Sequence, residues 1–281
     1  MTSDRPRPRF PDGDAAKRLG REAVDICAAG RYLSPTGRLV FIRDPLGRAV
    51  DETREYDLDW RPDPPPAPRA RTVVVVRDQT TLAAARDLVA ENRTPVALNF
   101  AAGTHPGGGF RSGATAQEES LAWSSGLFAC LKDRTYYDHH RAHPDPLHSE
   151  WAIYSPRVPV FRDDEGRLLE EPWECAFITC AAPNARRLDV DDAGVRTRIR
   201  AAMEVRVPRV LGIAAGHGHA AVVLGAWGCG AFGGNPDDVA RTFADALAGP
   251  YDGVFNQVTF AIFDASGEES QNLRAFRRHL G

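Results

Sequence analysis

Apolar runs and amphipathic stretches alternate along most of the chain. Five short runs are rich in β-branched and aromatic residues, as buried strands are. The stretches between and after them have apolar residues at helical spacing and begin at capping residues, Thr80 or Thr81 in one case and Asn235 in another. Strands that alternate with helices predict an α/β fold with a parallel or mixed sheet between two layers of helices. The expected strands cover 72–76, 95–100, 174–179, 220–224 and 258–263, and expected helices follow Thr80 and cover 116–132, 195–215, 235–247 and 270–280.

The beginning of the chain has a different pattern. Residues 14–29 have helical spacing and are followed by Gly30, a typical helix stop. Residues 38–44 and those directly after them are expected to form short strands around turns. Residues 1–13 are polar and rich in proline, so they are expected to be disordered.

A run of prolines over 61–71 (RPDPPPAPRAR) separates this beginning from the alternating elements. Proline lacks the backbone N–H and fixes φ, so the run excludes a helix or a central strand and indicates an extended crossing. A chain of 281 residues is long for one domain and short for two. We therefore expect an N-terminal accessory segment over 1–70 and a core domain over 71–281.

Composition and charge exclude several classes of protein. Hydrophobic residues make up 43% and charged residues 26%, which excludes a disordered chain and a collagen. No apolar run is long enough to span a membrane, and no secretory signal is expected at the N-terminus, so the expected location is cytoplasmic. The net charge of -3 argues against broad nucleic-acid binding, which needs a basic face. Five cysteines without a CxxC pair indicate neither a zinc ribbon nor a disulfide framework.

The first cluster of glycines follows the expected strand 95–100. Gly107, Gly108 and Gly109 form a loop whose backbone can approach a ligand closely. Gln117, Glu118 and Glu119 then open the next expected helix. An ordinary helix start is an alternative, because Thr115 and Glu118 have the spacing of a capping box and acids are favoured in a first turn. The triple glycine argues for a site, since a helix cap does not need it.

A second cluster of glycines lies between the expected strand 220–224 and the expected helix 235–247. Residues 228–233 (GCGAFG) match a GxGxxG dinucleotide pattern, but their place near the C-terminus makes that match weak. A diphosphate at the N-terminus of the following helix is physically sensible in either case. Phe232 either belongs to the core or packs on a ribose. Cys229 is expected to pack rather than to act as a nucleophile, because no histidine–acid partner can be identified.

Together these segments resemble the bacterial-type poly(ADP-ribose) glycohydrolases. The signature is GGG at 107–109, seven residues, and QEE at 117–119. LGAWGCGAFGGNP (224–236) is similar to the diphosphate loop of that family, and FAIFD (260–264) and REAVDICAAGRYLSPTGRLV near the start also resemble it. The resemblance implies a macrodomain-like three-layer α/β/α fold with a mixed sheet and an N-terminal extension. It implies hydrolysis of the ribose–ribose O-glycosidic bond of poly(ADP-ribose), mainly at chain ends, within the DNA damage response.

The same resemblance implies roles for individual residues. Glu119 is expected to be the main catalytic residue and Glu118 to bind and orient ribose hydroxyls. The expected substrate-binding residues are Asn99, Phe100, Ala101, Gly107, Gly108, Gly109, Thr115, Gln117, Gly228, Cys229, Gly230, Ala231, Phe232 and Phe263. No metal and no cofactor are expected. The expected partners are poly(ADP-ribose) and ADP-ribosylated proteins as substrates and ADP-ribose as product, without sequence-specific nucleic-acid binding or a membrane; the oligomeric state stays open.

Other functions are also consistent with the sequence. The enzyme could hydrolyse another ADP-ribose conjugate, such as a mono-ADP-ribosyl protein or O-acetyl-ADP-ribose, or the chain could be a reader that binds ADP-ribose without turnover. An NAD-dependent oxidoreductase is a more distant alternative.

The histidines of 136–148 (YYDHHRAHPDPLH) are expected in a solvated loop, because prolines interrupt the segment. His217 and His219 are expected to be structural.

Overall fold

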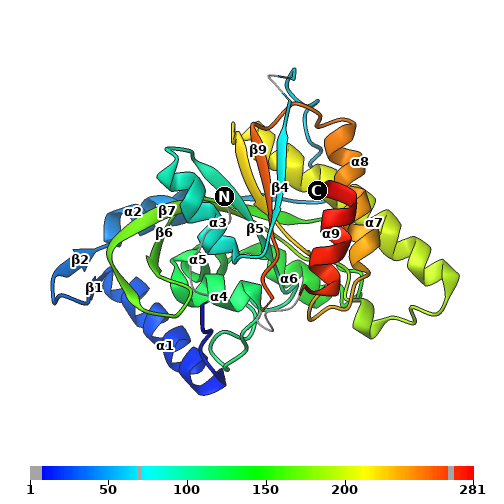
Figure 1. The fold of residues 1–281 in the computed structure, drawn as a ribbon. Helices are drawn as coiled ribbons and strands as arrows, with labels where there is room; N and C mark the ends of the chain where they lie inside the picture. The colour runs from blue at the N-terminus through cyan, green and yellow to red at the C-terminus, as the bar shows by residue number, and fades with distance from the viewer. Residues whose placement is uncertain (1–7, 69–70, 265–268) are drawn as a thin grey trace.

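The computed structural model describes residues 8–68, 71–264 and 269–281. Its centre is a seven-stranded mixed sheet in the order β3-β6-β7-β5-β8-β9-β4 (Figure 1). The neighbours from β7 through β5, β8 and β9 to β4 pair in parallel, while β6 pairs antiparallel with β7 and with β3. The strands are β3 (Arg54–Tyr56), β4 (Val73–Arg77), β5 (Pro95–Phe100), β6 (Ala152–Arg162), β7 (Leu168–Cys180), β8 (Ala221–Leu224) and β9 (Gln257–Ala261).

Helices cover both faces of this sheet, as the alternating pattern predicted. One layer holds α7, α8 and α9, whose apolar side chains form a core with one face of the strands. The other face packs against α3, α4, α5 and α6. The described helices are α1 (Gly13–Ala29), α2 (Arg43–Asp51), α3 (Thr81–Ala90), α4 (Gln117–Ser124), α5 (Leu127–Leu131), α6 (Thr135–Ala142), α7 (Ala193–Gly216), α8 (Pro236–Ala248) and α9 (Gln271–Leu280), with a 3-10 turn at Ala185–Arg187.

The N-terminal elements pack on the side of the sheet that carries α4. The helix α1 starts after the Asp12 cap, ends at Gly30 in the left-handed conformation, and lies against α4. Its apolar face joins a core cluster with Trp123 and Phe161. The small antiparallel sheet of β1 (Arg31–Leu33) and β2 (Leu39–Phe41) follows. The expected boundary near residue 70 stays a prediction. The expectation of disorder for 1–13 lies outside the described residues for 1–7, and it is wrong where Phe10 packs on Phe263 and Asp12 caps α1.

Most of the expected elements are confirmed. The strand at 95–100 has the predicted bounds, and its burial follows from its place at the centre of the sheet. Thr80 caps α3 through Ala83 N–H, and Asn235 caps α8 through Asp237 N–H. The helix expected over 195–215 is one continuous α7, with Pro208 inside it.

Five features differ from what the sequence suggested. Residues 116–132 form two helices, because Ser125 leaves helical geometry to bridge Val160. The capping box does not form, since Ala116 takes the N-cap position without a side-chain bond. The strand at 73–77 is only partly buried, because β4 lies at the edge of the sheet. Residues 43–51 form α2 and residues 135–142 form α6, both where non-helical structure was expected.

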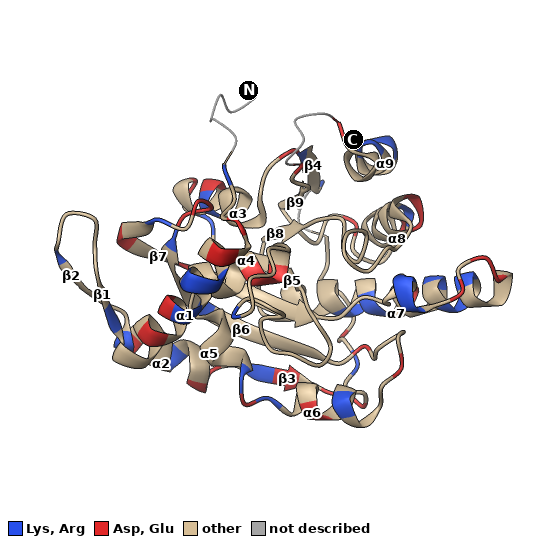
Figure 2. Ribbon diagram, turned by 90° about the horizontal axis from the view of Figure 1, so that it is seen from below, with Lys and Arg blue, Asp and Glu red and all other residues tan. Residues whose placement is uncertain are grey.

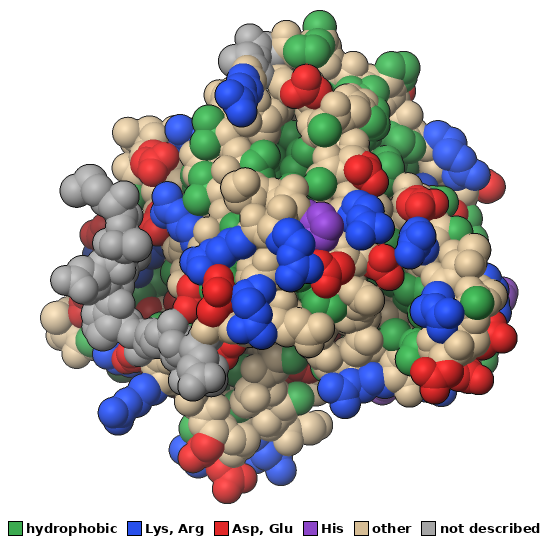
Figure 3. Space-filling model, turned by 45° about the vertical axis from the view of Figure 1, so that its right-hand side comes forward, with side chains coloured by type: hydrophobic (Ala, Val, Ile, Leu, Met, Phe, Trp, Pro, Cys, Tyr) green, Lys and Arg blue, Asp and Glu red, His purple; other side chains and the backbone are tan. Residues whose placement is uncertain are grey.

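Charged side chains are distributed without a dominant sign. Acidic positions mark the start of α4 next to β5, while the outer helices carry both signs (Figure 2). On the face shown in Figure 3, basic and acidic side chains are interspersed. Among the described helices, none is both long and apolar enough to cross a membrane.

Candidate active site

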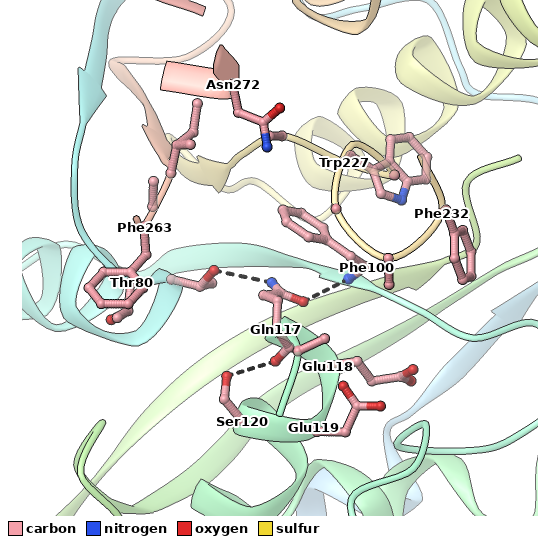
Figure 4. Close-up of a pocket in the computed structure, with 18 of the residues that line it drawn as sticks. Thr80, Phe100, Gln117, Glu118, Glu119, Ser120, Trp227, Phe232, Phe263 and Asn272 are labelled. Atoms are coloured by element: carbon pink, nitrogen blue, oxygen red, sulfur yellow. Dashed lines mark hydrogen bonds between the residues drawn. The ribbon is translucent and has the colours of Figure 1, made fainter. Parts of the chain in front are cut away.

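A cavity of about 490 Å³ opens at the carboxyl ends of β5 and β9. Its wall combines the start of α4, the loop after β8 and the residues that follow β9. Ligands of α/β sheets bind at this edge, where loops leave the strands, and the volume suits a nucleotide-sized ligand. Figure 4 shows Phe263 and Phe232 at opposite ends of the cavity, with Glu118 and Glu119 nearer to Phe232.

Gln117 fixes the start of α4 against the sheet. Its Oε1 accepts a hydrogen bond from Phe100 N–H at 2.9 Å, and its Nε2 donates to Leu98 O at 2.8 Å. The same Nε2 donates to Thr81 Oγ1 at 3.1 Å, so the amide also ties α4 to α3. These three hydrogen bonds hold the Gln117 side chain in place. They therefore also fix the positions of Glu118 and Glu119, which follow it in the chain.

Glu118 is a buried acid at the floor of the cavity. Only 4% of the residue is exposed, and Oε2 accepts a hydrogen bond from Ala102 N–H at 2.6 Å. Its Oε1 faces Asn99 Nδ2 at 3.4 Å. Burial raises the pKa of Glu118 well above its usual range, and the neighbouring Glu119 carboxyl raises this pKa further. The Ala102 and Asn99 donors oppose the shift because they favour the carboxylate. The site therefore favours the neutral form of this acid.

Glu119 is held by the triple-glycine loop. Its Oε1 accepts a hydrogen bond from Gly109 N–H at 2.8 Å. Gly108 has a left-handed φ of 60°, and a Cβ on it would collide with the Glu119 carboxyl. Glycine is thus required here by both backbone conformation and space. The loop supports the acid directly, and its predicted wrapping of ribose and diphosphate stays a prediction.

The second glycine loop forms the opposite wall. Gly228, Gly230, Ala231 and Phe232 line the cavity, together with the buried Trp227. Gly228 has a left-handed φ of 79°, and its carbonyl accepts a bond from Gly234 N–H at 2.9 Å, which closes the loop before α8. Such a turn exposes backbone N–H groups near a helix N-terminus, a common anion-binding arrangement.

Cys229 belongs to this loop but does not line the cavity. Its thiol contacts Trp227 O at 3.7 Å, and burial raises the pKa of the Cys229 thiol to about 12. The thiolate is the nucleophilic form of cysteine, and at neutral pH it is essentially absent from such a thiol. The chemistry agrees with the expectation that Cys229 packs and does not react.

The far end of the cavity is aromatic. Phe263 follows β9, and its ring centroid lies 5.1 Å from that of Phe10 with an interplanar angle of 46°. Asn272 of α9 also lines this end. Reasoning from the sequence missed both Phe10 and Asn272. The signal for Phe10 was its isolation as a large apolar residue in a polar segment between Met1 and Leu19.

The predicted site residues fall into two groups. Those that line the cavity are Phe100, Thr115, Gln117, Glu118, Glu119, Gly228, Gly230, Ala231, Phe232 and Phe263. The others lie behind this lining: Asn99 and Ala101 are fully buried, Gly107, Gly108 and Gly109 surround the acids, and Cys229 supports the second loop. Ala102, which was not predicted, lines the cavity and donates to Glu118.

The histidines lie outside the cavity. His139 and His140 belong to α6, and His139 stacks on His143 with ring centroids 4.4 Å apart. The expected loop is wrong at these positions, because the prolines come after the helix has ended. Within the described ranges, no three His, Cys, Asp or Glu side chains are arranged to hold a metal ion. His217 and His219 pair with Tyr56 and Tyr154 hydroxyls at 2.6 and 2.8 Å, as structural residues do.

A mixed sheet between helix layers, with a nucleotide-sized cavity at its carboxyl edge, defines a macrodomain-like protein. The two adjacent acids on the cavity floor give it the chemistry of a glycosidase. The family model of the microbial-type PARG catalytic domain matches residues 20–163. The chain belongs to this family, the bacterial-type poly(ADP-ribose) glycohydrolases.

Solved structures agree with this assignment. Poly(ADP-ribose) glycohydrolase from Thermomonospora curvata is 44% identical, with a TM-score of 0.89 over 95% of this chain and 100% of that chain. The same enzyme bound to the inhibitor ADP-HPD is 43% identical over 94% of this chain and 99% of that chain, with a TM-score of 0.85. The enzyme from Deinococcus radiodurans in complex with ADP-ribose is 37% identical over 83% of this chain and 96% of that chain, with a TM-score of 0.74. No curated protein matches the sequence.

Proposed function

We propose that this protein removes ADP-ribose from the end of poly(ADP-ribose) by hydrolysis of the ribose–ribose O-glycosidic bond. One observation carries the proposal. Glu118 and Glu119 lie side by side on the floor of a nucleotide-sized cavity, held by the triple-glycine loop and by Ala102 N–H. A binding module for an anionic ligand has no use for two carboxylates beside it, whereas glycoside cleavage needs an acid and a base.

The cavity suggests how the terminal unit lies. The diphosphate faces the N–H groups of the loop at Gly228 and Gly230, near the N-terminus of α8. The adenine lies toward Phe263 and Phe10, because a flat base stacks on aromatic rings. The terminal ribose then reaches the acids. A local anion site of this kind grips one unit and needs no broad basic face, consistent with the mixed charges of Figure 3.

Glu119 is the proposed catalytic acid and base. In the first step it gives its proton to the leaving 2′-oxygen of the next ribose while the bond from the terminal C1″ breaks. In the second step it takes a proton from the attacking water and returns to its starting form. Glu118, held in place by Ala102 N–H, binds the ribose hydroxyls and orients the terminal sugar.

Phe10 supports cleavage at chain ends rather than within the chain. Its ring lines the cavity beside Phe263 and comes from the N-terminal segment that precedes α1. An internal unit must leave the cavity at both of its ends, and in the proposed binding mode the Phe10 ring stands at the adenine end. We therefore propose a mainly exo-acting enzyme.

The test is incubation of the protein with poly(ADP-ribose) and, separately, with mono-ADP-ribosylated protein and O-acetyl-ADP-ribose, followed by chromatography of the products. The proposal expects single ADP-ribose units from the polymer from the earliest time points. Release from the mono-modified substrates alone would identify a hydrolase of another conjugate. Tight ADP-ribose binding without any release would identify a reader, and early release of oligomers would contradict the exo mode.

A further inference from the structure

Asn99 lies directly behind the Glu118 carboxyl. It is the penultimate residue of β5, the central strand of the sheet, and none of its surface is exposed. Its Nδ2 donates to Glu118 Oε1 at 3.4 Å and to Thr179 Oγ1 at 3.2 Å, on the paired position of β7. Asn99 therefore touches the acid without lining the cavity, and it was predicted from the sequence as a substrate contact.

The other end of this amide has no partner among the described residues. Asn99 Oδ1 is buried and accepts no hydrogen bond within the described part of the chain. A buried acceptor without a partner costs about 1–3 kcal/mol, so its presence calls for an explanation. The amide oxygen and nitrogen are nearly identical in shape, so a half-turn of the group exchanges them without changing the packing.

Each orientation suits one protonation state of Glu118. When Glu118 is a carboxylate, the Nδ2 group of Asn99 donates to it. When Glu118 is a carboxylic acid, the turned amide presents Oδ1, which accepts the acid proton, and Thr179 Oγ1 changes from acceptor to donor. Ala102 N–H holds the other carboxyl oxygen, Oε2, in both states.

The titratable groups that face Glu118 affect which of its two protonation states it adopts. Glu119 on the same helix raises the pKa of Glu118, so the proton affinity of one acid changes whenever the other gains or loses charge. Tyr136 and Tyr137 of α6 lie within electrostatic reach of Glu118, and both side chains are fully buried. Both are neutral at ordinary pH, because burial raises their pKa values far above the usual range.

We propose that Asn99 is a positioning residue that lets the Glu118 carboxyl gain and lose a proton without moving. The inference rests on the proposed function, in which Glu119 gives up a proton in one step and regains it in the next. As the charge of Glu119 changes, Asn99 either donates to the Glu118 carboxylate or, with its amide turned, accepts from the Glu118 carboxylic acid. The carboxyl group stays in place, so the ribose hydroxyls keep a fixed hydrogen-bond partner throughout the reaction.

The test replaces Asn99 and follows the Glu118 proton directly. Infrared difference spectra over a pH titration report the C=O stretch of a buried carboxylic acid and need no turnover. The Asn99→Leu variant removes both the donor and the acceptor; because the structure records the donor facing Glu118, loss of the carboxylate's partner is expected to dominate, and this band is expected to titrate at higher pH than in the wild type. In a plot of kcat against pH, the transition that reports the ionisation of Glu118 is expected to move to higher pH as well, with little change in KM.

Matched variants keep the test decisive. Asn99→Asp preserves the shape of the side chain if Asn99→Leu fails to fold, and its added carboxyl is also expected to move the band to higher pH. Ser124→Ala removes a buried hydroxyl of α4 that has no partner in the described structure, and it is expected to leave the band and the transition unchanged. Lower activity with an unmoved band and transition would reduce Asn99 to a packing residue and overturn the inference. Absence of polymer hydrolysis by the wild type would instead contradict the proposed function, and the infrared titration would still test Asn99.

Discussion

Glu119 Oε1 accepts a hydrogen bond from the backbone N–H of Gly109 at 2.8 Å, so the triple glycine and the second acid of QEE form one structural unit. The seven residues between the two motifs are the length of chain that folds the loop back onto the start of α4. The spacing in the sequence therefore reflects a contact between the loop and the acid. Binding of the ligand by the glycine N–H groups is a separate expectation.

Gly108→Ala is expected to lower kcat by about 100-fold, because a misplaced catalytic group costs on this scale. The added Cβ would displace the Glu119 carboxyl, and the left-handed φ adds strain. Gly37→Ala is the matched control, since Gly37 also has a left-handed φ but no neighbour within 4 Å. Steady-state kinetics on the polymer check this. Equal losses in the two variants would assign the effect to backbone strain and contradict the contact.

Phe10→Ala is expected to raise the Kd for ADP-ribose by about 5- to 150-fold, the range of one base–aromatic stack. The loss follows from the place of the ring at the end of the cavity beside Phe263. Isothermal titration calorimetry with ADP-ribose measures it. Phe41→Ala is the control, because Phe41 is 65% exposed on β2 and does not line the cavity. An unchanged Kd for Phe10→Ala would remove the N-terminal segment from the nucleotide site.

Glu118→Gln is expected to stabilise the empty enzyme at neutral pH. The folded-state pKa of Glu118 is raised above the usual value of 4.5, so its contribution to stability is complete below that pH. It is lost as pH rises through the folded-state pKa, because the unfolded chain ionises freely there. The variant has no proton to lose, and each kcal/mol regained raises Tm by about 2–4 °C.

Thermal unfolding at pH 4 and pH 8 checks this sign. The Tm difference between Glu118→Gln and the wild type is expected to be larger at pH 8 and to shrink at pH 4. Asp133→Asn is a control, because the Asp133 side chain is 82% exposed. A lower Tm of Glu118→Gln at pH 8 would show that the wild-type carboxylate stabilises the fold, against the direction of the pKa shift.

Cys229→Ala is expected to keep kcat within about threefold of the wild type, because a partly buried thiol with a raised pKa does not supply a nucleophile. Burial raises the pKa of the thiol to about 12, so alkylating reagents are expected to react slowly with it at neutral pH. Polymer hydrolysis before and after treatment with iodoacetamide measures both points. Rapid inactivation of the wild type, with protection in Cys229→Ala, would show that Cys229 takes part in the reaction.

Local patterns predicted the elements whose structure depends on local chemistry. The strand at 95–100 and the caps at Thr80 and Asn235 were predicted from burial pattern and capping chemistry alone. QEE at a helix start and the glycine loops beside the cavity were also predictable, because both the motif and its place after a strand are visible in the sequence.

Features that depend on distant contacts were not predictable. Ser125 breaks the expected long helix because it pairs with Val160, a residue 35 positions later. The exposure of β4 follows from its place at the edge of the sheet, which no local pattern encodes. Phe10 joins the cavity through its contact with Phe263. The cytoplasmic location and the role in the DNA damage response stay predictions.

Hydrolysis of poly(ADP-ribose) by Glu119→Gln, compared with the wild type, tests the central claim most directly. The variant keeps the size of the side chain and an oxygen for Gly109 N–H, but it cannot give or take the catalytic proton. We expect kcat to fall by about 100- to 10,000-fold, the usual contribution of general acid–base catalysis, while the Kd for ADP-ribose stays within about threefold. Hydrolysis at the wild-type rate with unchanged binding would contradict the assignment of Glu119 and the mechanism built on it.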